Sequence, residues 1–249
     1  MTSRAPEWVS VAARATGTGH VRRGERCQDA LILRHAGSRI VLVVADGAGS
    51  APHGGAGAAI ACRTAARTAL TMLGGDAPIA QTAAAGATSA AERLAQVGDR
   101  HAVAPRDLAT TLIVAVADTD EVAVAHVGDG AAVVREEDSW RALSWPAAGD
   151  YAGTTYFLTD AAPEVRISGT GPVTGIAVLT DGLERLVLDH AAQSAHSPFF
   201  EMIARPLVAC APGRDRSLSA ALARYLASDA VTQRTDDDTT LALAVRADR

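Results

Sequence analysis

The chain has 249 residues, 48% of them hydrophobic, so it can bury a substantial core. Its formal net charge of −5 leaves no excess of cations to attract nucleic acid or an anionic membrane, and we expect it to bind neither. The three cysteines, Cys27, Cys62 and Cys210, are widely spaced and odd in number, which argues against a disulfide framework and against a cysteine zinc site.

No apolar run approaches the roughly 20 residues that span a bilayer, and the N-terminal residues lack the apolar core of a signal peptide. With no repeats or low-complexity linkers, the sequence predicts one domain over residues 1–249, and the cysteine pattern favours the reducing cytoplasm. The chain also contains no Lys and no Asn, so every basic residue other than His is Arg. An Asn missing from a motif is therefore weak evidence against that motif.

The first part of the chain predicts a strand, a turn and a hairpin. Residues 7–15 have the apolar content of a strand, and the Gly/Arg-rich residues 17–26 predict a turn. Residues 30–35 and 39–45 then predict a hairpin whose turn contains a glycine. The second strand of this hairpin is an unbroken apolar run, which is typical of a strand that is buried on both faces.

Two acidic residues flank the hairpin. Asp29 precedes its first strand and Asp46 follows its second. Because the strands of a hairpin run antiparallel, both carboxylates are expected at the same edge of the sheet.

Two alanine-rich helices are predicted next, over residues 55–73 and 78–97, because small apolar residues recur on one face of each. Three strand candidates follow at 109–117, 121–127 and 131–135. The segments between them are short enough for hairpins, so we expect these three strands to form an antiparallel meander.

The remaining segments alternate between strands and short helices. Strands are expected at 155–159, at 165–168, in the run that ends at Asp181, and at 239–245; helices are expected from Gly182, at 198–208 and at 217–228; residues 147–153 are expected to form a mobile flap. Elements grouped in this way predict an α+β fold in which mostly antiparallel sheets lie inside and helices lie outside.

Acidic residues gather at the predicted strand ends and turns: Asp29, Asp46, Asp129, Asp181, Asp236, Asp237 and Asp238. A hard divalent ion such as Mg²⁺ or Mn²⁺ takes oxygen ligands from carboxylates, backbone carbonyls and waters. Taken singly, an Asp-Gly pair is more often a turn than a metal ligand. Asp46 and Asp181, however, each follow an apolar run, where an unpaired charge is costly and a metal compensates it. A two-ion site of this kind favours phosphate-ester hydrolysis.

Six short motifs occur along the chain in a fixed order: Cys27-Gln28-Asp29, Val44-Ala45-Asp46-Gly47-Ala48-Gly49, Ala109-Thr110-Thr111-Leu112, Val127-Gly128-Asp129, Leu179-Thr180-Asp181-Gly182 and Asp237-Asp238-Thr239-Thr240. Through them the chain resembles, over almost its whole length, the metal-dependent protein phosphatases of type 2C, also called the PPM family. The DGAGS sequence at 46–50 and the segments 156–160 and 196–200 resemble a divergent bacterial branch of stand-alone phosphatases found beside kinases and von Willebrand-type proteins.

The resemblance implies a four-layer α-β-β-α sandwich, in which antiparallel helix pairs flank the two sheets. It also implies hydrolysis of phosphoserine and phosphothreonine in proteins by direct attack of a water activated at a dinuclear Mg²⁺ or Mn²⁺ centre. Asp46, Asp181 and Asp237 would be the catalytic residues, with Asp46 bridging the two ions. The implied metal-binding residues are Asp29 (through water), Asp46, Gly47 (through its carbonyl), Asp129 (at a third ion, with Asp181), Asp181 and Asp237.

The chain departs from the family pattern at two functional positions. The family usually has a phosphate-binding Arg five residues before the first motif Asp, where this chain has Gly24; Arg22, Arg23 and Arg26 surround that position, and the choice among them is open. Many members have a proton-donating His directly after the central Asp-Gly, where this chain has Ala48. His53 and His20 are the candidates for that role, although each is more commonly a solvent-exposed loop residue.

Two other functions stay open beside the phosphatase that dephosphorylates proteins. The missing Arg motivates a phosphatase-like regulatory module that binds a partner and hydrolyses little, but the retained aspartates count against it. The other alternative is a hydrolase of small phosphate esters. For the leading hypothesis, the expected partners are a phosphorylated protein and a bacterial Ser/Thr kinase or its targets.

Several remaining side chains favour packing roles over functional ones. His126 is expected to be a packed histidine and Cys27 a small buried thiol. Trp140 and Trp145 lie near the expected flap, where packing and contact with a peptide substrate are equally compatible with the sequence.

Overall fold

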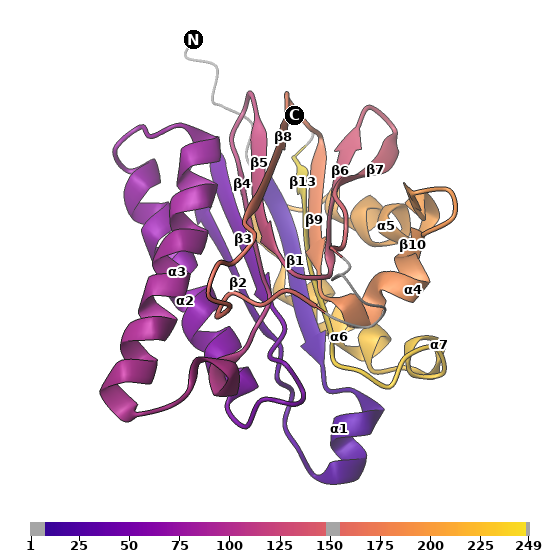
Figure 1. The fold of residues 1–249 in the computed structure, drawn as a ribbon. Helices are drawn as coiled ribbons and strands as arrows, with labels where there is room; N and C mark the ends of the chain where they lie inside the picture. Colours follow the sequence, from indigo (N-terminus) through magenta and orange to yellow (C-terminus); the bar gives the residue numbers. More distant parts are fainter. Residues whose placement is uncertain (1–7, 148–154, 248–249) are drawn as a thin grey trace.

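The computed structural model describes residues 8–147 and 155–247, and within these residues two large β-sheets face each other (Figure 1). One sheet has the order β2-β3-β4-β5-β8, with bounds Ala30–Ala36, Arg39–Ala45, Leu112–Ala117, Val122–Val127 and Arg166–Thr170. The other has the order β12-β1-β13-β9-β6-β7, with bounds Gly213–Arg214, Trp8–Ala15, Thr239–Arg246, Gly175–Leu179, Ala131–Glu136 and Ser139–Ser144. In the described part of the chain, the β1–β12 contact is parallel and the other pairings are antiparallel.

Helices cover the outer face of each sheet, which confirms the predicted four-layer α+β sandwich (Figure 1). On one side lie α2 (Gly54–Leu73) and α3 (Ile79–His101), and on the other lie α4 (Glu184–Val187), α5 (Ser197–Ala204), α6 (Arg216–Leu226) and α7 (Asp229–Thr232). Shorter pieces are the turns η1 (Pro105–Leu108), η2 (Asp181–Leu183) and η3 (Arg205–Leu207) and the ribbon of β10 (Leu188–Asp189) and β11 (Ser194–Ala195). None of the helices in the described residues has the length and hydropathy needed to cross a membrane.

The strand β3 shows why the sequence folds into layers. Its alternate residues face in opposite directions: Val41 and Val43 pack under α2 and α3, while Leu42 packs against the other sheet. All three are fully buried, as the unbroken apolar run predicts. The helices approach closely because small residues line their inner faces; Ala65 of α2 lies opposite Gly86 of α3.

The hairpin and its predicted consequence are confirmed. The strands β2 and β3 pair with Ala30 opposite Ala45, so Asp29 and Asp46 leave the sheet at the same edge. The Gly/Arg-rich segment that follows β1 is a helix rather than a simple turn: α1 spans Thr18–Arg23. It lies at the same end of the sandwich as this edge (Figure 1).

The predicted meander is wrong in its last strand. The strands β4 and β5 do pair, but β5 continues to β8, whereas β6 pairs with β7 and β9 in the opposite sheet. Residues 128–130 are therefore a crossover between sheets and not a hairpin turn. Strand propensity does not say which sheet a strand joins, and the buried faces of β5 and β6 are equally apolar.

Two further expectations need correction. Strand β7 is not among the predicted strands, and residues 155–159, predicted as a strand, contain no regular strand. The expected flap at 147–153 lies outside the described residues except for residue 147.

One glycine is required where the ends of β9 and β13 approach each other. A Cβ on Gly182 would lie 2.0 Å from the Asp238 carbonyl oxygen, which is backbone and cannot rotate away. We therefore predict that Gly182→Ala lowers the free energy of unfolding by about 1–3 kcal/mol, measured by urea denaturation of the metal-free protein. Gly171→Ala is the matched control, because its Cβ would meet no atom within 4 Å. Equal stability of the two variants would contradict this assignment.

Candidate metal centre

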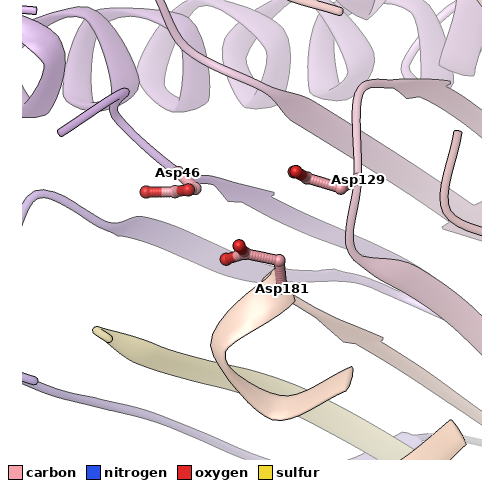
Figure 2. A group of neighbouring side chains, drawn as sticks. All are labelled: Asp46, Asp129 and Asp181. Carbon is pink, nitrogen blue, oxygen red and sulfur yellow. The ribbon is translucent and has the colours of Figure 1, made fainter. Parts of the chain in front are cut away.

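Three aspartates from separate elements point toward one another at one end of the sandwich (Figure 2). Asp46 follows β3, Asp129 lies in the crossover between β5 and β6, and Asp181 follows β9. One carboxylate oxygen from each lies within 4.8 Å of the other two. Asp46 and Asp181, which each follow an apolar run, thus lie together, and Asp129 joins them. Oxygen ligands at this spacing suit a hard divalent cation.

The backbone of Asp46 is fixed by two buried threonines at the start of the neighbouring strand. Its carbonyl accepts hydrogen bonds from the Thr111 N–H, at 2.9 Å, and from the Thr110 hydroxyl, at 2.7 Å. Its N–H donates to the Thr111 hydroxyl at 3.0 Å. The two threonines of the Ala-Thr-Thr-Leu motif therefore position Asp46. Neither was assigned a role from sequence, since the pairing of these strands had to be known first.

Asp29 lies deeper than the other three aspartates and is 2% exposed. Its Oδ2 accepts hydrogen bonds from the hydroxyls of Thr180, at 2.8 Å, and Thr240, at 2.6 Å. A carboxylate at the start of β2 is thereby tied to the ends of two strands in the opposite sheet. No role for either threonine follows from the sequence pattern, although Thr180 directly precedes a predicted ligand.

Asp237 lines an open cleft beside this cluster. The cleft has a volume of about 630 Å³, and its walls also contain Asp129 and Asp181. Asp237 is exposed and does not belong to the close group of three, but its charge contributes to the raised pKa values of Asp46 and Asp181. Gly47, the predicted carbonyl ligand, forms an isolated antiparallel bridge with Thr110.

Burial and mutual repulsion raise the pKa values of these carboxyls. Burial is the main cause that raises the pKa of Asp181 to about 8, followed by the charges of Asp129 and Asp237. Burial, followed by the charges of Asp29 and Asp181, raises the pKa of Asp46 well above its usual value. Burial also raises the pKa of Asp129, and it raises that of Asp29 to about 6 against the opposing threonine hydrogen bonds. The cluster thus resists ionisation in the absence of a cation.

A further carboxyl, Glu184, supports the crossover that carries Asp129. Its Oε1 accepts the Gly130 N–H at 2.7 Å, and burial raises its pKa to about 7. On the other side, the Thr155 hydroxyl donates to Asp129 Oδ2 at 2.5 Å. Glu184 was missed from sequence because it lies within a short helix, outside any strand end.

The residues present fit a divalent metal. Within the described residues, Asp29 Oδ1 and Asp129 Oδ1 are buried without a hydrogen-bond partner. Unpartnered oxygens of this kind are costly unless a cation or an ordered water contacts them. Together with the raised pKa values, they indicate a site whose charge is balanced by a bound ion.

The sequence suggested that His20 is a solvent-exposed loop residue, and this expectation is wrong. His20 is 5% exposed in α1, and its Nδ1 lies 2.9 Å from the Oδ1 of Asp238, itself 1% exposed. The same carboxylate accepts the N–H groups of Gly17, at 2.7 Å, and Gln28, at 2.6 Å. Asp238 therefore attaches α1 to the start of β13, and His20 is engaged in this attachment.

The other predicted phosphate and proton candidates lie on the surface. Arg22 is 3.8 Å from Asp236, Arg23 pairs with Glu25 at 2.8 Å, and Arg26 is exposed. His53 is exposed at the start of α2, as its sequence context suggested.

The packing assignments are largely confirmed. His126 is fully buried between the Ser144 hydroxyl and the Asp129 carbonyl, at 2.7 and 3.0 Å. Cys27 is a half-buried free thiol whose pKa is raised to about 12, mainly by burial. Trp140 is buried and stacks on Phe200 with ring centroids 5.4 Å apart. The half-buried Trp145 meets the ring of His190 edge-on.

Comparisons with known proteins identify related chains. The family model described as "Protein phosphatase 2C" matches residues 16–227. The chain is 34% identical over 251 residues to "Serine/threonine-protein phosphatase 3" of Escherichia coli (strain K12), and the alignment covers 97% of this chain and 99% of that protein.

Two solved structures show the same fold. PppA of Pseudomonas aeruginosa, described as a key regulatory component of T6SS, matches with a TM-score of 0.69 at 16% identity, covering 97% of this chain and 99% of that one. The catalytic domain of the serine/threonine protein phosphatase PstP, solved in complex with 2 manganese ions, matches with a TM-score of 0.63 at 16% identity, covering 98% and 99%.

The raised pKa of Asp181 leads to a prediction about pH. This carboxyl titrates near 8 in the folded metal-free protein and near its usual value of about 3.9 when unfolded. Its stabilising contribution is therefore complete below pH ~4 and is lost as the pH rises through about 8. We expect the melting temperature of EDTA-treated protein to fall between pH 6 and pH 9, and Asp181→Asn to weaken that fall.

The control is Asp99→Asn, a change at an exposed residue of α3. This variant should keep the wild-type pH dependence. If Asp181→Asn also kept it, the carboxyl would not have the raised pKa described above. Stabilisation by added Mn²⁺ should grow with pH, because the ligands must first lose their protons.

Proposed function

The chain belongs to the protein phosphatase 2C family, and we propose that Asp46, Asp181 and Asp237 are the residues on which its activity depends. It is a metal-dependent serine/threonine protein phosphatase, and its substrates are phosphoproteins. The observation that best supports Asp46 and Asp181 is their convergence with Asp129 within 4.8 Å at one end of the sandwich, and Asp237 lines the cleft beside them.

Each residue has a distinct part in this proposal. Asp46, fixed through its backbone, would hold the centre of the site, with Asp29 behind it and the Gly47 carbonyl beside it. Asp181 and Asp129 would close the other side, and Asp237 would face the open cleft from which substrate enters. When bound, divalent ions supply Lewis acidity that activates water and neutralises charge on the phosphoryl oxygens.

Further details of the proposal concern the ions, the partners and the compartment. Carboxylate and carbonyl oxygens favour Mg²⁺ or Mn²⁺. The proposed centre has two ion positions, and a third position would involve Asp129. We propose that the protein is a bacterial signalling enzyme that opposes a Ser/Thr kinase in the cytoplasm, and that residues 1–249 form one phosphatase domain. The regulatory module with little activity and the hydrolase of small esters are not favoured, because Asp46, Asp129 and Asp181 form a close carboxylate group and the curated relative is named a serine/threonine-protein phosphatase.

Phosphate release tests this function directly. We expect purified protein to release phosphate from a phosphothreonine peptide with Mn²⁺ and to release none with excess EDTA. Asp46→Asn should lower kcat by at least about 10²-fold with little loss of folding, because it removes charge and not core packing. Asp99→Asn serves as the control. Absence of release by protein that binds Mn²⁺ in calorimetry would contradict the proposed function.

The three candidate arginines can be separated by kinetics. Arg22, Arg23 and Arg26 are all exposed and lie on or next to α1, so their individual removal should not disturb the core. We expect one of the three alanine variants to raise KM for a phosphopeptide about tenfold while the other two change it less than twofold. Equal and negligible effects at all three positions would place phosphate recognition elsewhere.

A further inference from the structure

A second groove, distinct from the metal cleft, runs along the open edge of the sandwich. It has a volume of about 770 Å³, and it lies between β1, the edge strand β2 and α6. Its walls contain Arg34, Arg214 and Arg216 together with His35, and its lining shares no residue with the metal cleft among the described residues. Arg34 belongs to β2, whereas Arg214 and Arg216 flank the start of α6, so the guanidinium groups come from both sides of the groove.

These arginines lack acidic partners. Within the described residues, none of the three forms an ion pair with a carboxylate. The nearest carboxylate in sequence, Asp215, is directed at the helix terminus, where it accepts the Leu218 N–H at 2.8 Å. The three cations therefore repel one another: desolvation and then the charges of Arg34 and Arg216 lower the pKa of Arg214.

Arg214, unlike Arg34 and Arg216, binds the backbone of β1. Its guanidinium donates to the Ala12 carbonyl at 2.7 Å, and the Ser219 hydroxyl accepts the Ala12 N–H at 3.2 Å. The Arg214 guanidinium and the Ser219 hydroxyl thus satisfy the backbone of β1 at Ala12, beyond the short pairing of β1 with β12. Arg34 and Arg216 are exposed and make no such contact with β1; Arg34 donates to the adjacent Leu33 carbonyl, which leaves most of its five N–H donors for a ligand.

The groove lies close enough to the metal cluster for one extended peptide to contact both. Arg34 is four residues along β2 from Ala30, the residue that pairs with Ala45 next to Asp46. At about 3.3 Å per residue this is roughly 13 Å, which four to six residues of extended peptide can bridge.

We propose that this arginine groove binds an acidic segment of the phosphoprotein substrate, about six residues away from the phosphorylated side chain. The proposal rests on the phosphatase function proposed above. Guanidinium groups recognise carboxylates and phosphates through paired N–H donors, and docking of such a segment would place the phosphorylated residue near the metal cleft. A peptide is favoured over a nucleic acid, because three cations in one groove on an acidic protein neutralise only a short anionic stretch.

Binding is tested first, without turnover, by fluorescence anisotropy in EDTA. The probes are two labelled phosphothreonine peptides that carry either four Glu or four Gln residues, centred six positions from the phosphothreonine. We expect wild-type protein to bind the Glu peptide about tenfold more tightly, and Arg34→Glu/Arg216→Glu to abolish that preference. The control is Arg67→Glu on the outer surface of α2, and Arg34→Gln/Arg216→Gln is a milder second variant. Thermal unfolding checks that each variant folds.

Steady-state kinetics in Mn²⁺ then show whether the arginines affect substrate binding or the chemical step. The double variant should raise KM for the Glu peptide about tenfold, leave kcat unchanged, and leave kcat/KM for para-nitrophenyl phosphate unchanged. Equal binding of the two peptides by wild-type protein would overturn the proposal, as would an undiminished preference in the double variant. Stronger binding of a short single-stranded oligonucleotide at the same arginines would overturn it in favour of a nucleic-acid site.

Binding and turnover together distinguish a wrong catalytic function from a wrong role of the groove. If both peptides bind as expected but neither is dephosphorylated in Mn²⁺, the proposed catalytic function is wrong and the groove stands. If both are dephosphorylated equally well by wild-type and double-variant protein, the function stands and the groove has no part in it.

Discussion

Repulsion among carboxylates that are gathered in a water-poor space is the constraint on which this structure depends. Asp29, Asp46, Asp129 and Asp181 meet at one end of the sandwich, and burial together with neighbouring charge raises the pKa of each. Such a group costs folding free energy unless a cation offsets it. The apolar layers must therefore supply enough stability to hold the cluster open for an ion, and the fully buried strands that lead into it provide that support.

The two sheets are joined at this end by polar contacts and not only by packing. Thr180 and Thr240 from one sheet donate to Asp29 from the other, and the threonines before β4 hold the Asp46 backbone. Short side chains with a single hydroxyl suit this task, because they fix a carboxylate or a carbonyl without competing for the metal. The position of each carboxylate thus depends on the register between strands that are far apart in sequence.

Sequence patterns were sufficient for features that are local or that follow from strand direction. The apolar run before Asp46 and the hairpin geometry placed Asp29 beside it, and both helices on that side were predicted within a few residues. The patterns failed where the partner is distant: a strand such as β6 carries the same apolar signal in either sheet. The His20–Asp238 pair and the arginine groove each combine segments separated by about two hundred residues, so no local pattern reveals them.

The backbone conformation at Gly24 accounts for the departure from the family pattern near the first motif. Gly24, at the position where the family usually has its arginine, ends α1 with φ of 70°, in the left-handed region where a side chain such as Arg is strained. The helix that Gly24 ends carries Arg22 and Arg23, and the buried Asp238 attaches this helix to the start of β13 through the N–H groups of Gly17 and Gln28 and through His20. The backbone at residue 24 therefore disfavours an arginine there, and the neighbouring arginines are the ones available for the same task.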